Sequence, residues 1–236
     1  MLACLMSLVA CSDDSAEPAV PEASQENQEP RTLRYLALGD SYTIGTGLPD
    51  PQGAYPHQLF KLLDEDAMIE GKTLEIIAQN GWTTAALSQG LNAAAPDSNF
   101  QLVSLLIGVN NQYQGLDTSI YRAEFDSLLE RAIAHAQGNE RQVFVLSIPD
   151  YSLSPFASSQ NLDPDVTAEQ IDRYNGMAEG MASARGVSFW DITALSRQLV
   201  ADDAMLAADG LHPSAAQYAQ WVEQIVESVK SKIYEP

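Results

Sequence analysis

A serine stands directly after a short apolar segment, at a point where a strand would end in a turn. Residues 33–38 are apolar apart from Arg34, and Gly39, Asp40 and Ser41 follow them. A glycine lets the backbone bend sharply, and the start of a following helix would offer N–H groups to an anion. Ser41 is therefore our candidate nucleophile, although Gly-Asp-Ser also describes an ordinary polar turn.

A carboxylate and an imidazole lie three residues apart near the end of the chain, at Asp209 and His212. At this spacing Asp209 can hold one ring nitrogen of His212 while the other nitrogen faces a serine. Pro213 would restrict His212 to an extended backbone. The alternative is a loop aspartate that caps a helix beginning near Ser214. Together with Ser41, the pair completes a candidate triad.

Acyl transfer also needs donors for the oxyanion that forms when a carbonyl is attacked. Two middle segments offer them, residues 80–81 (Asn-Gly) and residues 108–110 (Gly-Val-Asn). Both follow apolar runs, so both should emerge at the same edge of a parallel sheet as Ser41. Each segment taken alone is equally well an ordinary turn.

These four segments, in this order, resemble the GDSL or SGNH hydrolase family, whose blocks are a GDS serine, a glycine, a GxN asparagine and a DxxH pair. The resemblance extends from about Tyr35 to Trp221, and residues 107–113 and 147–150 look like one bacterial branch of the family. It implies a serine esterase that works through an acyl-enzyme.

Carried over residue by residue, the resemblance makes Ser41 the nucleophile, with His212 as the base and Asp209 as its orienter. Many members have Asp after the block asparagine, whereas this chain has Asn111, so the role of that acid is not transferred. The implied oxyanion donors are the backbone N–H groups of Ser41 and Gly81 and the side-chain amide of Asn110.

Apolar runs alternate with helical patterns, which indicates βαβ units around a five-stranded parallel sheet and the α/β class. Two helices have capping-box starts, Thr167 with Gln170 and Ser214 with Gln217. The family resemblance adds a three-layer, flavodoxin-like fold with strand order 2-1-3-4-5. The expected strands are residues 33–38, 73–78, 101–107, 143–148 and 187–191. The expected helices are residues 55–68, 83–91, 119–137, 167–185 and 214–232.

The composition and the family resemblance together lead us to expect a truncated signal segment, a disordered acidic linker and one catalytic domain, at residues 1–11, 12–31 and 32–236. Residues 8–11 (Leu-Val-Ala-Cys) resemble the lipobox of bacterial lipoproteins, in which Cys11 would be lipidated. Ser12 then favours the outer membrane, so we expect a lipid-anchored protein of the cell envelope. Residues 12–30 hold six acids, three prolines and no Lys or Arg, as a spacer should. The alternative is a short apolar N-terminus with an incidental cysteine, since no basic residue precedes it.

The formal charge of −20 excludes some partners. An acidic surface without a basic stripe repels phosphate polymers, which argues against nucleic acid. Cys4 and Cys11 both lie in the leader, so no disulfide is expected in the domain. We expect no metal and no cofactor, because the sequence has no H-x-D or Cys-rich array, and His57 and His135 read as surface or packing residues. We also expect a monomer.

Residues that follow the strand ends are candidates for a substrate pocket, although loop aromatics are equally often packing residues. We expect a small-molecule or glycan ester with a short acyl or O-acetyl group. One alternative is a lysophospholipase or thioesterase that acts on lipid esters. Another is a non-catalytic surface lipoprotein that binds glycan. The candidate pocket residues are Trp82, Asn111, Tyr113, Tyr151 and Phe156.

Overall fold

The computed structural model describes residues 31–64 and 69–234. The proposed lipidation site, Cys11, and nearly all of the acidic linker lie outside these residues and remain predictions. The expected end of the first helix at Met68 also lies outside them. Among the described helices, none is long and apolar enough to cross a membrane.

Five parallel strands form the sheet, in the order β2-β1-β3-β4-β5 that the family resemblance implied. Every residue of β3 and β4 is buried, as in a parallel sheet that is covered on both faces. β1 lies between β2 and β3, where Leu38 is opposite Ile77 of β2 and Leu105 of β3. The predicted α/β class is therefore confirmed. The strands are Arg31–Gly39 (β1), Ile69–Ala78 (β2), Leu102–Leu106 (β3), Val143–Leu146 (β4) and Ser188–Trp190 (β5).

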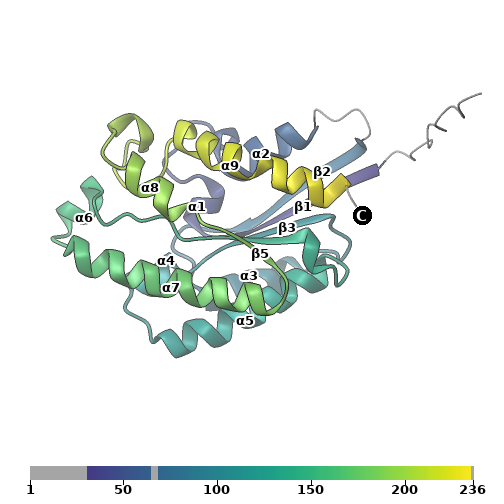
Figure 1. The fold of residues 1–236 in the computed structure, drawn as a ribbon, viewed down its shortest axis with the longest axis horizontal. Helices are drawn as coiled ribbons and strands as arrows, with labels where there is room; N and C mark the ends of the chain where they lie inside the picture. Colours follow the sequence, from purple (N-terminus) through teal and green to yellow (C-terminus); the bar gives the residue numbers. More distant parts are fainter. Residues whose placement is uncertain (1–30, 65–68, 235–236) are drawn as a thin grey trace, which may run out of the picture.

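Helices cover both faces of the sheet, which gives three layers (Figure 1). One face carries α2 (Tyr55–Asp64) and α9 (Ala215–Tyr234). The other face carries α3 (Thr84–Ala94), α5 (Thr118–His135) and α7 (Pro164–Ala184). Short helices follow four of the strands: α1 (Ser41–Ile44), α4 (Val109–Tyr113), α6 (Pro155–Ser159) and α8 (Thr193–Leu199). Short 3₁₀ helices span Pro51–Gly53, Glu140–Gln142 and Asp203–Met205.

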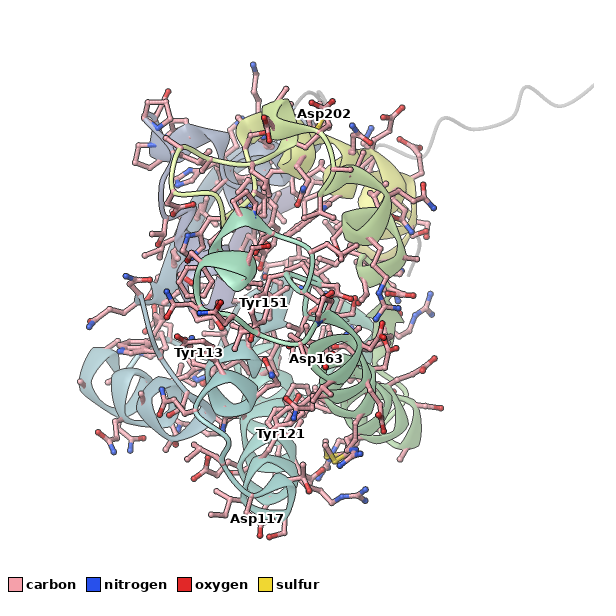
Figure 2. The ribbon with its side chains drawn as sticks, turned by 90° about the vertical axis from the view of Figure 1, so that its left-hand side faces the viewer. Tyr113, Asp117, Tyr121, Tyr151, Asp163 and Asp202 are labelled. Carbon is pink, nitrogen blue, oxygen red and sulfur yellow. The ribbon has the colours of Figure 1, made fainter. Side chains whose placement is uncertain are left out.

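Figure 2 looks onto the end of the molecule that holds the carboxyl ends of the strands. Tyr113 and Tyr151 lie near the middle of this face, and aspartates that begin helices surround them. The backbone N–H groups that start α5 and α7 donate to Asp117 and Asp163, respectively. Polar loops and helix starts therefore gather where ligands bind in open α/β sheets.

The two predicted helix starts have different outcomes. α9 begins directly after Ser214, whose hydroxyl accepts the backbone N–H of Gln217 at 3.3 Å, as predicted. The start at Thr167 was wrong, because α7 begins at Pro164. Asp163 caps that helix, and the fixed φ of a proline suits the first helical position. Thr167 lies buried inside the helix.

Candidate active site

Gly39 places Ser41 where the carboxyl end of β1 turns into α1. A Cβ atom at Gly39 would lie 2.4 Å from the carbonyl oxygen of Leu106 in β3, so a side chain does not fit there. Asp40 caps α1, because its carboxylate accepts the backbone N–H of Tyr42 at 3.0 Å. Ser41 is the first residue of the helix, a position whose backbone N–H has no intrahelical acceptor.

The carboxyl group of Asp40, next to Ser41 in the chain, is buried. Burial raises the pKa of Asp40 to about 7, and the hydrogen bond from the Tyr42 N–H opposes this rise only in part. The second carboxyl oxygen has no hydrogen-bond partner among the described residues. Asp40 is therefore an acid that changes charge near neutral pH.

Asp209 holds both the ring and the backbone of His212. Asp209 Oδ2 lies 2.6 Å from His212 Nδ1, while Oδ1 accepts the backbone N–H groups of Leu211 and His212, each at 3.0 Å. Burial opposes the charge of Asp209, but the hydrogen bonds outweigh it and keep the pKa of this carboxyl below its usual range. With Nδ1 held in this way, the second ring nitrogen of His212 is left for the pocket.

Gly81 and Asn110 bring N–H groups to the same place from the ends of β2 and β3. Gly81 has a φ of +78°, and a Cβ there would meet nothing within 4 Å, so this backbone borders open space. Asn110 lies in the first turn of α4, and its Nδ2 donates to the carbonyl oxygen of Trp82 at 2.9 Å. This bond turns the amide toward the loop that carries Gly81, and the second N–H of the amide remains for a ligand.

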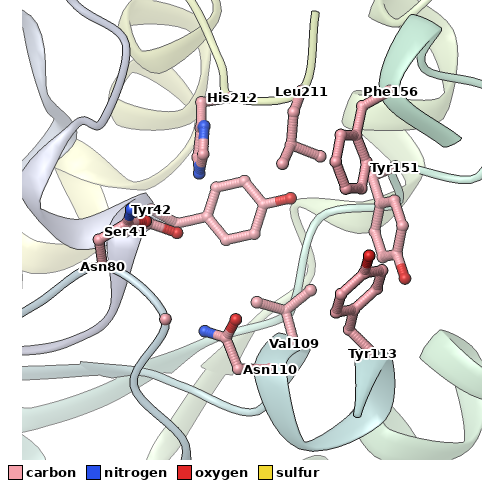
Figure 3. Close-up of a pocket in the computed structure, with 11 residues that line it drawn as sticks. Ser41, Tyr42, Asn80, Val109, Asn110, Tyr113, Tyr151, Phe156, Leu211 and His212 are labelled. Carbon is pink, nitrogen blue, oxygen red and sulfur yellow. The ribbon is translucent and has the colours of Figure 1, made fainter. Parts of the chain in front are cut away.

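A pocket of about 160 Å³ unites these groups (Figure 3). The ring of His212 points toward Ser41, and Asn110 lies on the far side of Ser41 from His212. An imidazole held by a carboxylate can take the proton of a serine, and N–H donors can stabilise an oxyanion. The lining residues are Ser41, Tyr42, Asn80, Gly81, Val109, Asn110, Tyr113, Tyr151, Phe156, Leu211 and His212.

Three rings form the wall opposite Ser41, and we call Tyr113, Tyr151 and Phe156 the aromatic wall. Their centroids are 5.9 Å apart for Tyr113 and Phe156 and 6.5 Å apart for the other two pairs. Tyr113 is 47% exposed, whereas Tyr151 is buried. The wall therefore runs from the surface into the protein.

Two of the predicted pocket residues, Trp82 and Asn111, are not part of the lining. The ring of Trp82 packs on Gly90 of α3, where a Cβ would lie only 2.2 Å from it. Asn111 is fully buried and joins α4 to α3: its Oδ1 accepts the Thr84 N–H at 3.0 Å, and its Nδ2 donates to Thr84 Oγ1 at 2.7 Å. Both residues are packing elements.

No pocket role was predicted from the sequence for four lining residues: Tyr42, Leu211, and Asn80 and Val109 of the two oxyanion segments. Each is a direct neighbour of a predicted site residue, which is the signal that could have identified it. Tyr42 matters most, because its ring packs edge-on against the imidazole of His212 at 5.5 Å and its carbonyl accepts the Tyr218 hydroxyl at 2.8 Å. It therefore forms part of the support of the imidazole.

Comparisons with solved structures show the same fold. The esterase EstA from Pseudoalteromonas sp. is 14% identical with a TM-score of 0.64, covering 84% of this chain and 97% of its own. Phospholipase A1 from Streptomyces albidoflavus is 21% identical (TM-score 0.61; 86% and 100% covered). A variant of the acetyl-xylooligosaccharide esterase Axe2 from Geobacillus stearmophilus is 20% identical (TM-score 0.61; 89% and 98% covered). Among curated proteins, no sequence matches the chain.

The family model of the GDSL-like lipase/acylhydrolases matches residues 37–220. This range includes all of the pocket lining and both members of the Asp209–His212 pair. The chain therefore belongs to the GDSL-like lipase/acylhydrolase family and is a carboxylic ester hydrolase.

Proposed function

We propose that Ser41 is the nucleophile of this ester hydrolase, with His212 as its general base and Asp209 as the acid that orients the base. Ser41 Oγ attacks the ester carbonyl while the free nitrogen of His212 takes the hydroxyl proton. The departing alcohol takes that proton, and an acyl-enzyme remains. Water then attacks the acyl carbonyl and gives a proton to His212, and His212 passes this proton to Ser41 Oγ as the carboxylic acid leaves. The observation that carries the proposal is the 2.6 Å contact of Asp209 with His212 beside a pocket that Ser41 also lines.

In the same proposal, the oxyanion is bound by the N–H groups of Ser41 and Gly81 and by the amide of Asn110. The open backbone at Gly81 and the orientation of Asn110 support this role. Because the fold already holds these donors in place, they can stabilise the oxyanion without reorganising during the reaction.

We propose short acyl or O-acetyl groups as the preferred substrates. The cavity of about 160 Å³ is small beside the ~300–1,000 Å³ that is usual for ligand clefts. Its aromatic and aliphatic side chains suit a small apolar acyl group. The neighbour named as an acetyl-xylooligosaccharide esterase agrees with this choice, whereas the neighbour named as a phospholipase favours the lipid alternative.

Hydrolysis of p-nitrophenyl acetate, butyrate and octanoate by the wild type and by Ser41→Ala tests both parts of the proposal. We expect the wild type to prefer acetate or butyrate, and Ser41→Ala to lose on the order of 10⁴-fold in kcat. Equal activity in the two proteins would remove Ser41 from the mechanism. A preference for octanoate with Ser41-dependent turnover would instead replace the short-chain substrate by a lipid ester.

A further inference from the structure

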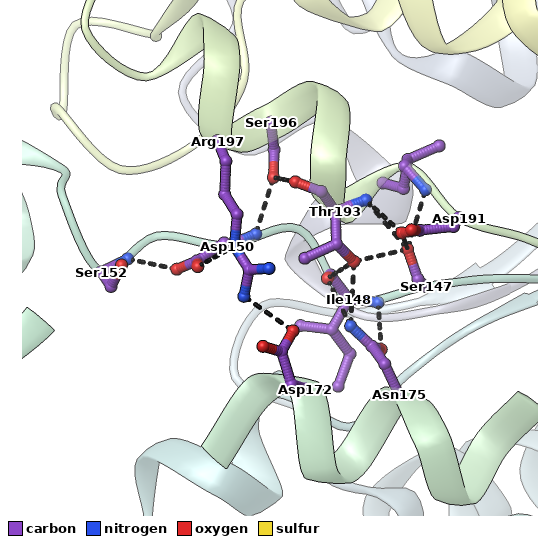
Figure 4. A network of polar contacts seen from close by, with 11 residues as sticks. Ser147, Ile148, Asp150, Ser152, Asp172, Asn175, Asp191, Thr193, Ser196 and Arg197 are labelled. Atoms are coloured by element: carbon purple, nitrogen blue, oxygen red, sulfur yellow. Dashed lines mark hydrogen bonds and ion pairs between the residues drawn. The ribbon is translucent and has the colours of Figure 1, made fainter. Parts of the chain in front are cut away.

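The segment that carries Tyr151 into the pocket is held by side chains of two helices. This β4–α6 loop, residues 147–154, lies beyond the last paired residue of β4. Ile148 donates its N–H to Asn175 Oδ1 at 2.7 Å, and its carbonyl accepts from Asn175 Nδ2 at 3.0 Å and Thr193 Oγ1 at 2.8 Å (Figure 4). Side chains of α7 and α8 therefore replace the strand partner that the loop lacks.

An ion pair between a buried carboxylate and a partly exposed guanidinium fixes the residue next to Tyr151. The side chain of Asp150 is only 2% exposed, and its Oδ2 accepts Nε of Arg197 at 2.7 Å. A second nitrogen of the same guanidinium donates to Asp172 on α7 at 2.7 Å. The other oxygen of Asp150 accepts the Ser152 N–H at 2.7 Å. Arg197 thus ties the loop to α7 and α8 at once (Figure 4).

Tyr151 is held at its other end as well. Its hydroxyl donates to Gln112 Oε1 at 2.9 Å, and Gln112 Nε2 donates to Gln170 Oε1 at 2.7 Å. Tyr151 lines the main pocket and also a second cavity of about 10 Å³, whose lining includes Asp150, and Tyr42 and Leu211 line both as well. Of these three residues, only Tyr151 belongs to the β4–α6 loop, so a movement of this loop would change where the main pocket ends.

The proposed mechanism determines which part of the substrate lies at this end of the pocket. His212 must return its proton to the leaving alcohol, so the alcohol lies on the His212 side of Ser41. The oxyanion points to Gly81 and Asn110, and the acyl group takes the remaining direction, toward the aromatic wall (Figure 3). This assignment rests on the proposed function.

We propose that Tyr151 is the end wall of the acyl site and that Asp150 and Arg197 are positioning residues that hold it there, so that this ion pair limits the acyl length that Ser41 accepts. Without the guanidinium, the buried Asp150 carboxylate loses its partner, and the loop must move to hydrate it. Tyr151 moves with the loop, and the pocket opens toward the second cavity.

The experiment compares kcat/KM for p-nitrophenyl octanoate and butyrate as a ratio, because a ratio is unaffected by a loss of folded enzyme. We expect Tyr151→Leu and Arg197→Gln each to raise the octanoate-to-butyrate ratio by at least about tenfold, the scale of one methylene in an apolar pocket. Arg197→Lys should give a smaller rise, because one ammonium cannot bridge both carboxylates as the fork does. The double variant Asp150→Asn with Arg197→Gln leaves no carboxylate to hydrate, but it also removes the guanidinium that ties the loop to α7 and α8, so it should raise the ratio by less than Arg197→Gln does.

Arg185→Gln is the matched control. Arg185 joins α7 to α5 through Asp126 at 2.9 and 2.8 Å, but it lies in neither cavity, so its ratio should equal that of the wild type. An unchanged ratio in Tyr151→Leu would show that Tyr151 is not the end wall of the acyl site. If the ratio changed in Tyr151→Leu but in neither Arg197→Gln nor the double variant, the positioning role of Asp150 and Arg197 would be overturned. If the variants changed the relative kcat/KM for acetate esters of different alcohols, and not for esters of different acyl length, both the end wall and the positioning role would be overturned. Failure of the proposed function looks different: wild type and Ser41→Ala would then hydrolyse both esters equally.

Discussion

Gly47 packs against the carboxylate of Asp209. A Cβ atom at Gly47 would lie 2.8 Å from Asp209 Oδ2, the oxygen that contacts His212, and the φ of Gly47 is +84°. A loop just after α1, which carries Ser41, therefore touches the acid at the other end of the chain. In the proposed mechanism, this close approach makes the orientation of His212 sensitive to a residue that touches no substrate.

Gly47→Ala should lower kcat by roughly 10²-fold, because the methyl group displaces Asp209 and turns the imidazole away from Ser41. Steady-state kinetics with p-nitrophenyl butyrate measures this loss. Gly138→Ala is the control, since Gly138 has nearly the same φ of +83° but nothing within 4 Å of a Cβ. If the two variants were equally active, the contact between residue 47 and Asp209 would have no effect on catalysis, and Gly47→Ala would introduce backbone strain alone.

Asn110→Ala should reduce kcat by about 10²-fold to 10³-fold, because one donor to the oxyanion is lost. KM should change little, since the bond to the oxyanion strengthens only in the transition state. Asn92→Ala, on the exposed side of α3, removes a similar amide that accepts from Arg131 and should keep full activity. A rise in KM with normal kcat would instead make Asn110 a ground-state binding residue.

Because Asp40 is buried, we expect the free energy of unfolding to depend on pH. The pKa of Asp40, which is about 7 in the folded protein, lies above the value of 3.8 that applies when the chain is unfolded. Between these values the folded state binds more protons, so the stability linked to Asp40 is complete below the unfolded pKa and is lost as the pH rises through about 7. The change is on the order of a few kcal/mol, at about 1.4 kcal/mol per pKa unit.

Chemical denaturation of the wild type and of Asp40→Asn from pH 5 to pH 8 measures this term. The difference between the two free energies of unfolding should shift in favour of Asp40→Asn as the pH rises, because asparagine never becomes charged. Groups such as Asp209 titrate in both proteins and cancel in the difference. A difference that is constant with pH would show that Asp40 is already charged in the folded protein at pH 5.

The sequence predicted the parts of the site that chain order determines. The residues after β1, β2 and β3 emerge at one edge because parallel strands all end there, and Asp209 reaches His212 because the pair shares one short loop. Side-chain direction was not predictable in this way. Trp82 follows a strand end, yet its ring turns to the flat surface that Gly90 leaves on α3, a surface that exists only once the helix is packed.

The helices show the same division. Long helices carry a repeating apolar pattern, and the four short ones, α1, α4, α6 and α8, are too short to show one. The true start of α7 was encoded, because Asp163 and Pro164 form a cap followed by a first-turn proline. The capping-box pattern at Thr167 is a competing signal inside the same helix, but the cap at Asp163 and the fixed φ of Pro164 start the helix one turn earlier.

Asn111→Asp tests the distinction between a packing residue and a site residue. The Oδ1 of Asn111 accepts the N–H of Thr84, and aspartate can keep this bond, but it cannot donate to Thr84 Oγ1 as Nδ2 does. The Thr84 hydroxyl already donates to Glu124, so the new carboxylate would be buried without a donor to its second oxygen. We expect a loss of about 1–3 kcal/mol in the free energy of unfolding, with kcat and KM nearly unchanged in the folded enzyme. Thr84→Val in the same background removes the hydroxyl and should add only the loss of its bond to Glu124, because the bond from residue 111 is already broken. Normal stability together with a changed KM would return Asn111 to the substrate pocket.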